Sequence, residues 1–159
     1  MNLKIPNTRE DLQPERTHRR TWAGLDWSQW KDLSSIRSVT RPYLPGVYRI
    51  RHGAYEGLVY IGETGQKQGL AGRRLPALAE NVYSNLETRS LNPDPQGVPH
   101  TAAPSLVRLC ERVDNRQLEI SYATPPKAEQ GIWMRRGIEA GLIALHRLIV
   151  GRSPWAFES

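Results

Sequence analysis

Residues 45–62 read Pro-Gly-Val-Tyr-Arg-Ile-Arg-His-Gly-Ala-Tyr-Glu-Gly-Leu-Val-Tyr-Ile-Gly, and this stretch decides the fold. Two runs rich in β-branched and aromatic residues flank a short polar loop, 52–56, which is the pattern of a β-hairpin. If the hairpin is symmetric about Ala54, Tyr48 lies directly opposite Tyr60. Opposite residues of an antiparallel pair project from the same face of the sheet. The sequence therefore predicts two phenols that stand side by side.

Further elements follow this hairpin. The segment 69–81 predicts a helix that starts near Leu75 with Pro76 in its first turn, and residues 83–99 predict a long loop rich in turn signals. A second helix is expected over 103–112, a third strand over 117–123 and a last helix over 130–150. The fold class predicted is α/β (α+β), with a small three-stranded antiparallel sheet flanked by helices.

The last helix is apolar nearly all the way round, so we expect it to be central to the fold. Glu139 is the exception within it. A carboxylate in apolar surroundings must be paired, protonated or bound to a cation. Arg135 and Arg136, four and three residues before it, could pair with it, and a metal ion is the other interpretation. A single carboxylate suits Mg²⁺, which keeps several waters and takes further ligands from a phosphate.

The triplets Gly46-Val-Tyr48 and Tyr60-Ile-Gly62 resemble the two halves of the signature of the GIY-YIG nuclease superfamily. The order of hairpin, helix with arginine, strand and helix with glutamate resembles that superfamily over roughly residues 42–150. It includes homing endonucleases, the N-terminal domain of an excision-repair nuclease and some restriction enzymes. The resemblance implies a GIY-YIG-like nuclease domain that hydrolyses DNA phosphodiester bonds with a divalent metal, Mg²⁺ or Mn²⁺.

The resemblance also implies which residues form the site. Either Tyr48 or Tyr60 would act as the general base, and the choice between them stays open. Arg74 fits the family arginine best, with Arg73 second. Glu139 matches the glutamate that binds the metal.

Three departures from the family pattern stand out. The family's His or Tyr four residues after the arginine is Leu78 here, and His100 could replace it in space or be an ordinary loop histidine. Glu63 stands where some members have lysine. The tail at 153–157 holds no family asparagine; His146 could substitute for it, although core packing is the better interpretation.

The chain has 159 residues, a net charge of +6 and a sequence pI near 9.8, which favours a polyanionic partner such as DNA. Residues 1–51 hold ten Lys/Arg and five Asp/Glu, which gives +5 of that charge. We expect residues 1–20 to be a mobile arm that either contacts DNA or is simply solvated. Arg19, Arg20 and Lys67 are the candidate DNA-binding residues.

Two domain regions are expected: a basic arm with a tryptophan-rich helical segment over 1–40, and the nuclease-like domain over 41–159. The stripe of Trp22, Trp27 and Trp30 would lie on one face of a short helix and pack on the core or on a second subunit, while stacking on nucleobases is the alternative. Cys110 is the single cysteine and is expected to be packed in a helix. No membrane span or signal peptide is visible in the sequence, so cytoplasm is the expected location.

The resemblance thus implies a restriction-like endonuclease, site-selective or modification-dependent, that works as a monomer or as a homodimer. Two alternatives stay open. One is a catalytically weakened nucleic-acid-binding module on the same fold, and the other is a repair or mobile-element nuclease that acts with a partner protein.

Overall fold

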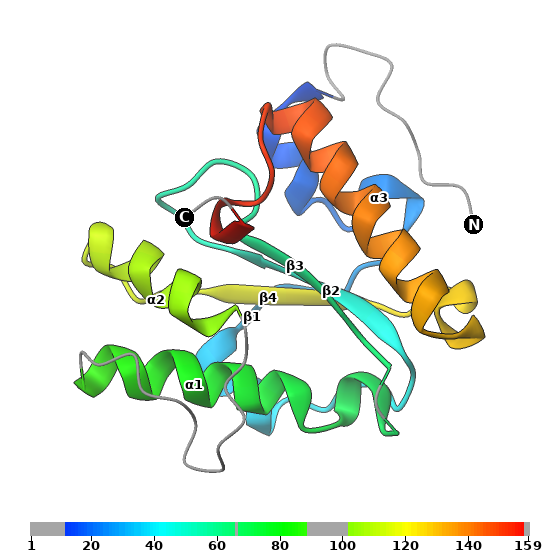
Figure 1. Ribbon diagram of the computed structural model, residues 1–159, viewed down its shortest axis with the longest axis horizontal. Helices are drawn as coiled ribbons and strands as arrows, with labels where there is room; N and C mark the ends of the chain where they lie inside the picture. The colour runs from blue at the N-terminus through cyan, green and yellow to red at the C-terminus, as the bar shows by residue number, and fades with distance from the viewer. Residues whose placement is uncertain (1–11, 66, 89–101, 158–159) are drawn as a thin grey trace.

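The computed structural model describes residues 12–65, 67–88 and 102–157, and all structural statements below concern these residues. It has a mixed α/β fold with a four-stranded antiparallel sheet in the order β1-β4-β2-β3 (Figure 1). The strands are β1 (Lys31–Asp32), β2 (Gly46–Arg51), β3 (Tyr60–Thr64) and β4 (Glu119–Ala123). The predicted number of three strands is wrong, because the two residues of β1 pair with β4 and are too few to show an alternating pattern.

Helices cover both faces of the sheet. Helices α1 (Arg74–Thr88) and α2 (Ala103–Arg112) lie on one side, and α3 (Ile132–Val150) lies on the other (Figure 1). Short 3₁₀ turns connect these elements, at Pro14–His18, Trp22–Gly24, Leu33–Ser38, Gly69–Ala71, Pro126–Gln130 and Trp155–Phe157. No helix among the described residues is both long and apolar enough to traverse a bilayer.

The central strand β2 contributes to the cores on both faces of the sheet, because its side chains alternate between the two faces. Tyr48 and Ile50 join the core formed with α1 and α2, whereas Val47 joins the core formed with α3. Both cores are closed to solvent at β2, since all three of these side chains are 0% exposed.

The predicted hairpin is present, but its predicted register is wrong by two residues. Tyr48 pairs with Gly62, and Tyr60 pairs with Ile50. The loop is longer than expected because residues 57–59 bond to other parts of the chain: the carbonyl oxygens of Leu58 and Val59 accept from the tail, at Trp155 and Ala156. A shift of two residues keeps each side chain on its face. The two tyrosines therefore still share one face, as diagonal neighbours.

The predicted loop over 83–99 begins too early, because α1 continues to Thr88. Val82 and Leu86 are buried in the core with α2, and the Asn81 and Asn85 side chains donate to carbonyl oxygens four residues earlier on the same helix. These local bonds remove the competition with the backbone that normally makes asparagine a weak helix former. Residues 89–101 lie outside the described residues.

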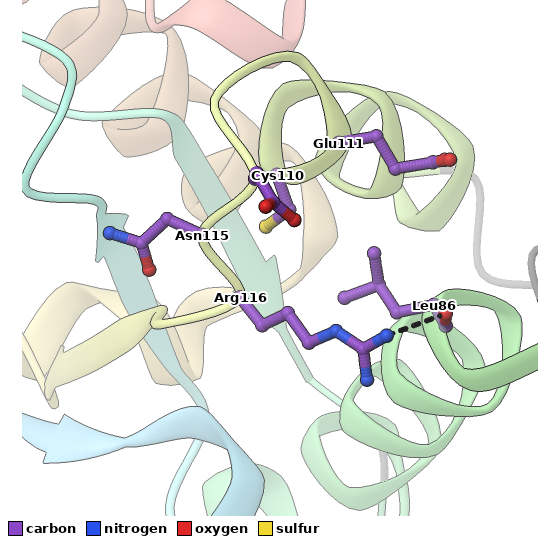
Figure 2. Close-up of a pocket in the computed structure, with 6 residues that line it drawn as sticks. Leu86, Cys110, Glu111, Asn115 and Arg116 are labelled. Carbon is purple, nitrogen blue, oxygen red and sulfur yellow. Dashed lines mark hydrogen bonds between the residues drawn. The ribbon is translucent and has the colours of Figure 1, made fainter.

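The far end of α1 is tied to the segment after α2. Figure 2 shows Arg116 reaching across a small cavity of about 90 Å³ to donate to the Leu86 carbonyl oxygen, at 3.1 Å. This bond satisfies a carbonyl in the last turn of α1, where no intrahelical donor is available. Cys110 is buried beside this cavity, as expected of a packed cysteine, and burial raises the pKa of its thiol to about 11.

The last helix is not buried all round. Ile138, Leu142 and Leu145 pack on the sheet, but Trp133 is 77% exposed and Leu148 is 61% exposed. The expectation of a central helix is therefore wrong. The helix covers one face of the sheet and keeps apolar side chains on its outer face.

The segment 12–30 is docked on the sheet rather than mobile, which corrects the prediction for this part of the arm; residues 1–11 lie outside the described residues. The tryptophan stripe is not one helix, because only Trp22–Gly24 forms a 3₁₀ turn before the chain extends. Trp22 and Trp27 are nevertheless buried against the core with α3, so the packing interpretation is confirmed. Stacking of these two rings on nucleobases is thereby ruled out.

Arg49 holds this docked segment. Its guanidinium lies 4.3 Å from the ring centroid of Trp27 and 4.6 Å from that of Trp30, and it donates to the carbonyl oxygens of Thr17 and His18. Burial, with a smaller effect of Arg51, lowers the pKa of Arg49 below that of an exposed arginine. The two carbonyl oxygens and the two ring faces compensate for the lost hydration of the cation.

We expect Arg49→Lys to destabilise the fold by about 2 kcal/mol, because an ammonium cannot reproduce the forked donation to two carbonyl oxygens. Chemical denaturation measures the loss, and limited proteolysis should show earlier cleavage within residues 12–30. Arg51→Lys is the matched control. Arg51 lies on the same strand and pairs with Glu119 at 3.0 Å in a partly exposed position, so its loss should stay below about 1 kcal/mol. Equal losses in the two variants would contradict the role given to Arg49.

Candidate active site

Tyr48 is the most deeply placed of the predicted site residues. Its side chain is 0% exposed, and its ring lies against the Cα of Gly62 on β3. A Cβ at position 62 would lie 2.4 Å from the Tyr48 Cζ atom, so only glycine fits there. Burial, followed by the neighbouring Tyr60, raises the pKa of Tyr48 well above its usual value, although a hydrogen bond with Arg74 opposes this.

Tyr60 lies beside Tyr48 but is only partly buried. The two ring centroids are 6.0 Å apart, and the Tyr60 ring also stacks on Phe157, with the ring centroids 5.1 Å apart. Burial and the Glu139 carboxylate raise the pKa of Tyr60, while Arg74 and a hydrogen bond from Tyr48 lower it. The predicted pairing of phenols is therefore confirmed in space, despite the shifted register.

Arg74 is the arginine that joins this cluster. It is the first residue of α1, and its guanidinium donates to the Tyr48 phenol. Burial lowers the pKa of Arg74, but its interactions with Tyr48, Tyr60 and Glu63 outweigh this and leave the pKa raised. Its Nε is buried and has no hydrogen-bond partner among the described residues. Arg73 is exposed and lines a separate groove, so the structure brings only one of the two candidate arginines to the tyrosines.

Glu139 reaches the same cluster from α3, although α3 and α1 lie on opposite faces of the sheet. The cluster forms at β3, which is the edge strand and contacts α3. Glu139 raises the pKa of both phenols, and Arg74 lowers the pKa of Glu139. These mutual effects require short separations, because exposed charges are screened beyond about 10 Å.

A second carboxylate, Glu63, lies near Glu139 and was noted in the sequence only as a departure from the family pattern. Glu63 accepts from Arg135 Nε at 2.9 Å, and both side chains are largely buried, at 17% and 11% exposure. Arg135, one of the two expected partners of Glu139, is thus committed elsewhere. Burial and then Glu63 raise the pKa of Glu139, while Arg74 and Arg136 lower it. None of the salt bridges within the described ranges involves Glu139.

The carboxylates around Glu139 suit Mg²⁺ or Mn²⁺, which need few protein ligands, better than a metal that is coordinated entirely by protein side chains. No group of three or more His, Cys, Asp or Glu side chains that could hold a metal occurs in the described part of the chain. A half-buried carboxylate that is destabilised by a second carboxylate would gain from a bound cation. Mg²⁺ is commonly held by one or two carboxylates, with waters and substrate phosphate completing its coordination.

Of the other predicted site residues, the three that the structure describes do not join the cluster. His100 lies outside the described residues. Arg19, Arg20 and Lys67 are exposed, and Arg20 makes only a long ion pair of 3.7 Å with Asp26.

Leu78 and His146, which were compared with the family pattern, both pack within the fold. Leu78 is buried in the core with α1 and α2. His146 is 0% exposed and accepts from the Leu58 N–H at 2.9 Å through Nε2, while its Nδ1–H donates to the Arg152 carbonyl oxygen at 2.6 Å. Both ring nitrogens are therefore used in the fold, which confirms the packing interpretation of His146.

Comparisons with protein-family models, with curated proteins and with solved structures give no match.

We expect Gly62→Ala to displace Tyr48 and to destabilise the protein by about 1–3 kcal/mol, because the added methyl group overlaps the phenol ring. Thermal denaturation measures this loss. Gly53→Ala in the hairpin loop is the matched control, since a Cβ there meets nothing within 4 Å. A Gly62 variant as stable as the Gly53 variant would show that the ring is free to move.

We expect Glu139→Gln to raise stability at pH 7 by up to about 1 kcal/mol, because the half-buried carboxylate is costly when ionised. A raised pKa means that the folded state holds this proton more tightly than the unfolded state. The stabilising effect of protonation is present below about pH 4.5 and is lost as the pH rises through the folded-state pKa.

Melting temperatures measured from pH 4 to pH 7 test this prediction. The gain of Glu139→Gln over wild type should be near zero at pH 4 and grow towards pH 7. Exposed Glu129→Gln should show no such growth. Millimolar Mg²⁺ should stabilise the wild type more than Glu139→Gln. A gain independent of pH would contradict a destabilised carboxylate at position 139.

Proposed function

We propose that this protein is a divalent-metal-dependent DNA endonuclease of the GIY-YIG type, restriction-like in being site-selective or modification-dependent. The observation that carries the proposal is the cluster itself: Arg74 from α1 and Glu139 from α3 act electrostatically on both phenols at the sheet edge. A guanidinium, a carboxylate and two phenols from separate segments are the set that the resemblance to GIY-YIG nucleases implies for phosphodiester hydrolysis.

The unpaired Nε of Arg74 supports an anionic substrate. A buried N–H without a partner costs about 1–3 kcal/mol, and a phosphate oxygen would satisfy it. The guanidinium is already oriented by its bond to Tyr48, so little conformational freedom is lost when a phosphate binds.

Tyr60 is the better candidate for the general base. Its phenol is partly exposed and can reach a water, whereas Tyr48 is fully buried and bonded to Arg74. Both phenols have raised pKa values, so neither is an effective base near neutrality without added positive charge.

Each residue of the cluster then has its own role in an in-line displacement at phosphorus. Glu139 would hold Mg²⁺ or Mn²⁺, and the cation would supply positive charge near the phosphate and favour ionisation of the neighbouring phenol. Ionised Tyr60 would accept a proton from the attacking water, whose oxygen bonds to phosphorus while the bond from phosphorus to the leaving oxygen of the DNA strand breaks. Solvent water would protonate that leaving oxygen. Arg74 donates to a non-bridging phosphate oxygen, and Tyr48 keeps Arg74 in position. Arg135 holds Glu63 in an ion pair, which offsets part of the negative charge around Glu139.

The second candidate function is a nucleic-acid-binding module without hydrolytic activity. The observations that favour it are the burial of Tyr48 and the strongly raised pKa of its phenol, together with the absence of the family asparagine. A nuclease that acts only with a partner protein is a variant of the first proposal.

Plasmid cleavage in the presence of Mg²⁺ or Mn²⁺ separates these functions. We expect the wild type to cut methylated or unmethylated plasmid DNA, and we expect Glu139→Ala and Tyr60→Phe to lower the rate by about 10²–10⁴-fold. EDTA should abolish cutting by the wild type.

Glu111→Gln is the control for the removal of a carboxylate, because Glu111 is exposed on α2 away from the cluster. Its rate should equal that of the wild type. If the wild type binds DNA but cuts no modified or unmodified substrate with either metal, the binding module is the correct function.

A further inference from the structure

An arginine-lined groove lies beside the candidate active site and is not used by it. The groove has a volume of about 400 Å³ and is formed by the start of α1 and the segments that lead into it. Its lining includes three arginines and one glutamate: Arg37, Arg41, Arg73 and Glu80. Its formal charge is therefore +2, which suits an anion.

Arg41 is held rigidly in this groove. Its Nε donates to the Val39 carbonyl oxygen at 3.2 Å, and its Nη1 donates to the carbonyl oxygens of Leu70 at 2.9 Å and Gly72 at 3.4 Å. These bonds do not involve the two N–H groups of Nη2. The Arg41 side chain is partly buried, and this burial lowers its pKa. A fixed and partly buried guanidinium binds an oxyanion with little loss of side-chain freedom.

The other two arginines are more exposed. Arg37 donates to Glu80 at 3.0 Å, but its side chain is 73% exposed and that of Glu80 is 45% exposed. Such a surface ion pair contributes little to stability and can be exchanged for a stronger anion. Arg73 is exposed.

The groove and the cluster adjoin the same stretch of backbone at the start of α1. Arg73 lines the groove and the next residue, Arg74, contacts Tyr48 in the cluster. Consecutive Cα atoms are about 3.8 Å apart, so the two sites share one turn of backbone at the start of α1. The positive end of the α1 dipole lies at this turn and favours anions on both sides of it.

We propose that this groove binds the phosphate backbone of the DNA strand next to the phosphate held in the cluster. The inference rests on the proposed function for the choice of DNA as the anion. It assigns Arg37, Arg41 and Arg73 to backbone contacts, which position the duplex without reading its sequence. The surface differs from the one around Arg19 and Arg20 that the sequence suggested.

Binding measured without cleavage tests the proposal. Fluorescence anisotropy with a labelled duplex in EDTA gives the affinity at several salt concentrations. Arg37→Ala and Arg73→Ala should each weaken binding about 5- to 10-fold and reduce the slope of log K against log salt by about one. Glu80→Gln should act in the opposite direction and tighten binding, because it removes the negative charge of the groove. Arg41 is left unchanged because it also holds the backbone at residues 39 and 70–72.

Arg108→Ala is the matched control. Arg108 is an exposed arginine on α2, which lies near the opposite end of α1 (Figure 1), and its loss should change neither affinity nor salt slope. Melting temperatures of all variants confirm that they fold. If Arg73→Ala and Arg37→Ala bind as tightly as Arg108→Ala, or if Glu80→Gln does not tighten binding, the groove is not a backbone site.

A small chromogenic phosphodiester, thymidine 5′-p-nitrophenyl phosphate, separates this proposal from the proposed function. It carries a single phosphate, so no second phosphate is left for the groove once that phosphate is held in the cluster. Arg73→Ala should therefore hydrolyse it at the wild-type rate, while Glu139→Ala should not. Groove variants that weaken DNA binding in a protein without hydrolytic activity would support the groove and overturn the nuclease. A loss of small-substrate hydrolysis in Arg73→Ala would contradict the proposal that Arg73 contacts only the DNA backbone while Arg74 binds the reacting phosphate.

Discussion

The contact between the ring of Tyr48 and the bare Cα of Gly62 is the constraint on which the site depends. It sets the register of β2 against β3, because a side chain at position 62 would occupy the space of the phenol. The same contact leaves the phenol of Tyr48 within reach of the Arg74 guanidinium and beside Tyr60. A packing requirement at one glycine thus fixes three of the groups that make up the cluster.

The charged and phenolic groups of the cluster are not arranged as they would be in a site that only stabilises the fold. Two carboxylates and two phenols influence one another and Arg74 electrostatically, and burial raises the pKa of Tyr48, Tyr60 and Glu139. In a purely structural site, Glu139 would be expected to pair directly with an arginine of its own helix. Instead Arg135 is bonded to Glu63, and Glu139 is left with a raised pKa. Destabilised charges of this kind concentrate where a protein binds metals or substrates.

The opposite face of β2 attaches the N-terminal segment of the chain to the sheet. Arg49 points away from the tyrosines and is enclosed by Trp27 and Trp30, with the carbonyl oxygens of Thr17 and His18 as acceptors. Through these contacts the segment 12–30 covers the second core of the sheet. The strand that carries one site residue therefore also attaches the basic N-terminal part of the chain to the fold.

The sequence by itself determined the hairpin, the helices at 103–112 and 132–150 to within a few residues, the presence of a helix that starts near residue 75, and the shared face of the two tyrosines. These features follow from local periodicity, glycine positions and β-branched runs, which act over short distances along the chain. It did not determine the hairpin register, the two-residue strand β1 or the continuation of α1 beyond Tyr83. Those depend on bonds to remote segments, such as the tail at 155–156 and the partners of Val82 and Leu86.

The tertiary structure alone decided which of two adjacent arginines meets Tyr48, and which carboxylate Arg135 pairs with. Sequence spacing on a helix allowed Arg135 to pair with Glu139, but Glu63 on the edge strand lies closer in space. Likewise, Arg73 and Arg74 are equivalent as residue types, and only the direction in which α1 leaves the preceding turn separates them. The physical reason is that such choices depend on orientations between elements, which no short stretch of sequence contains.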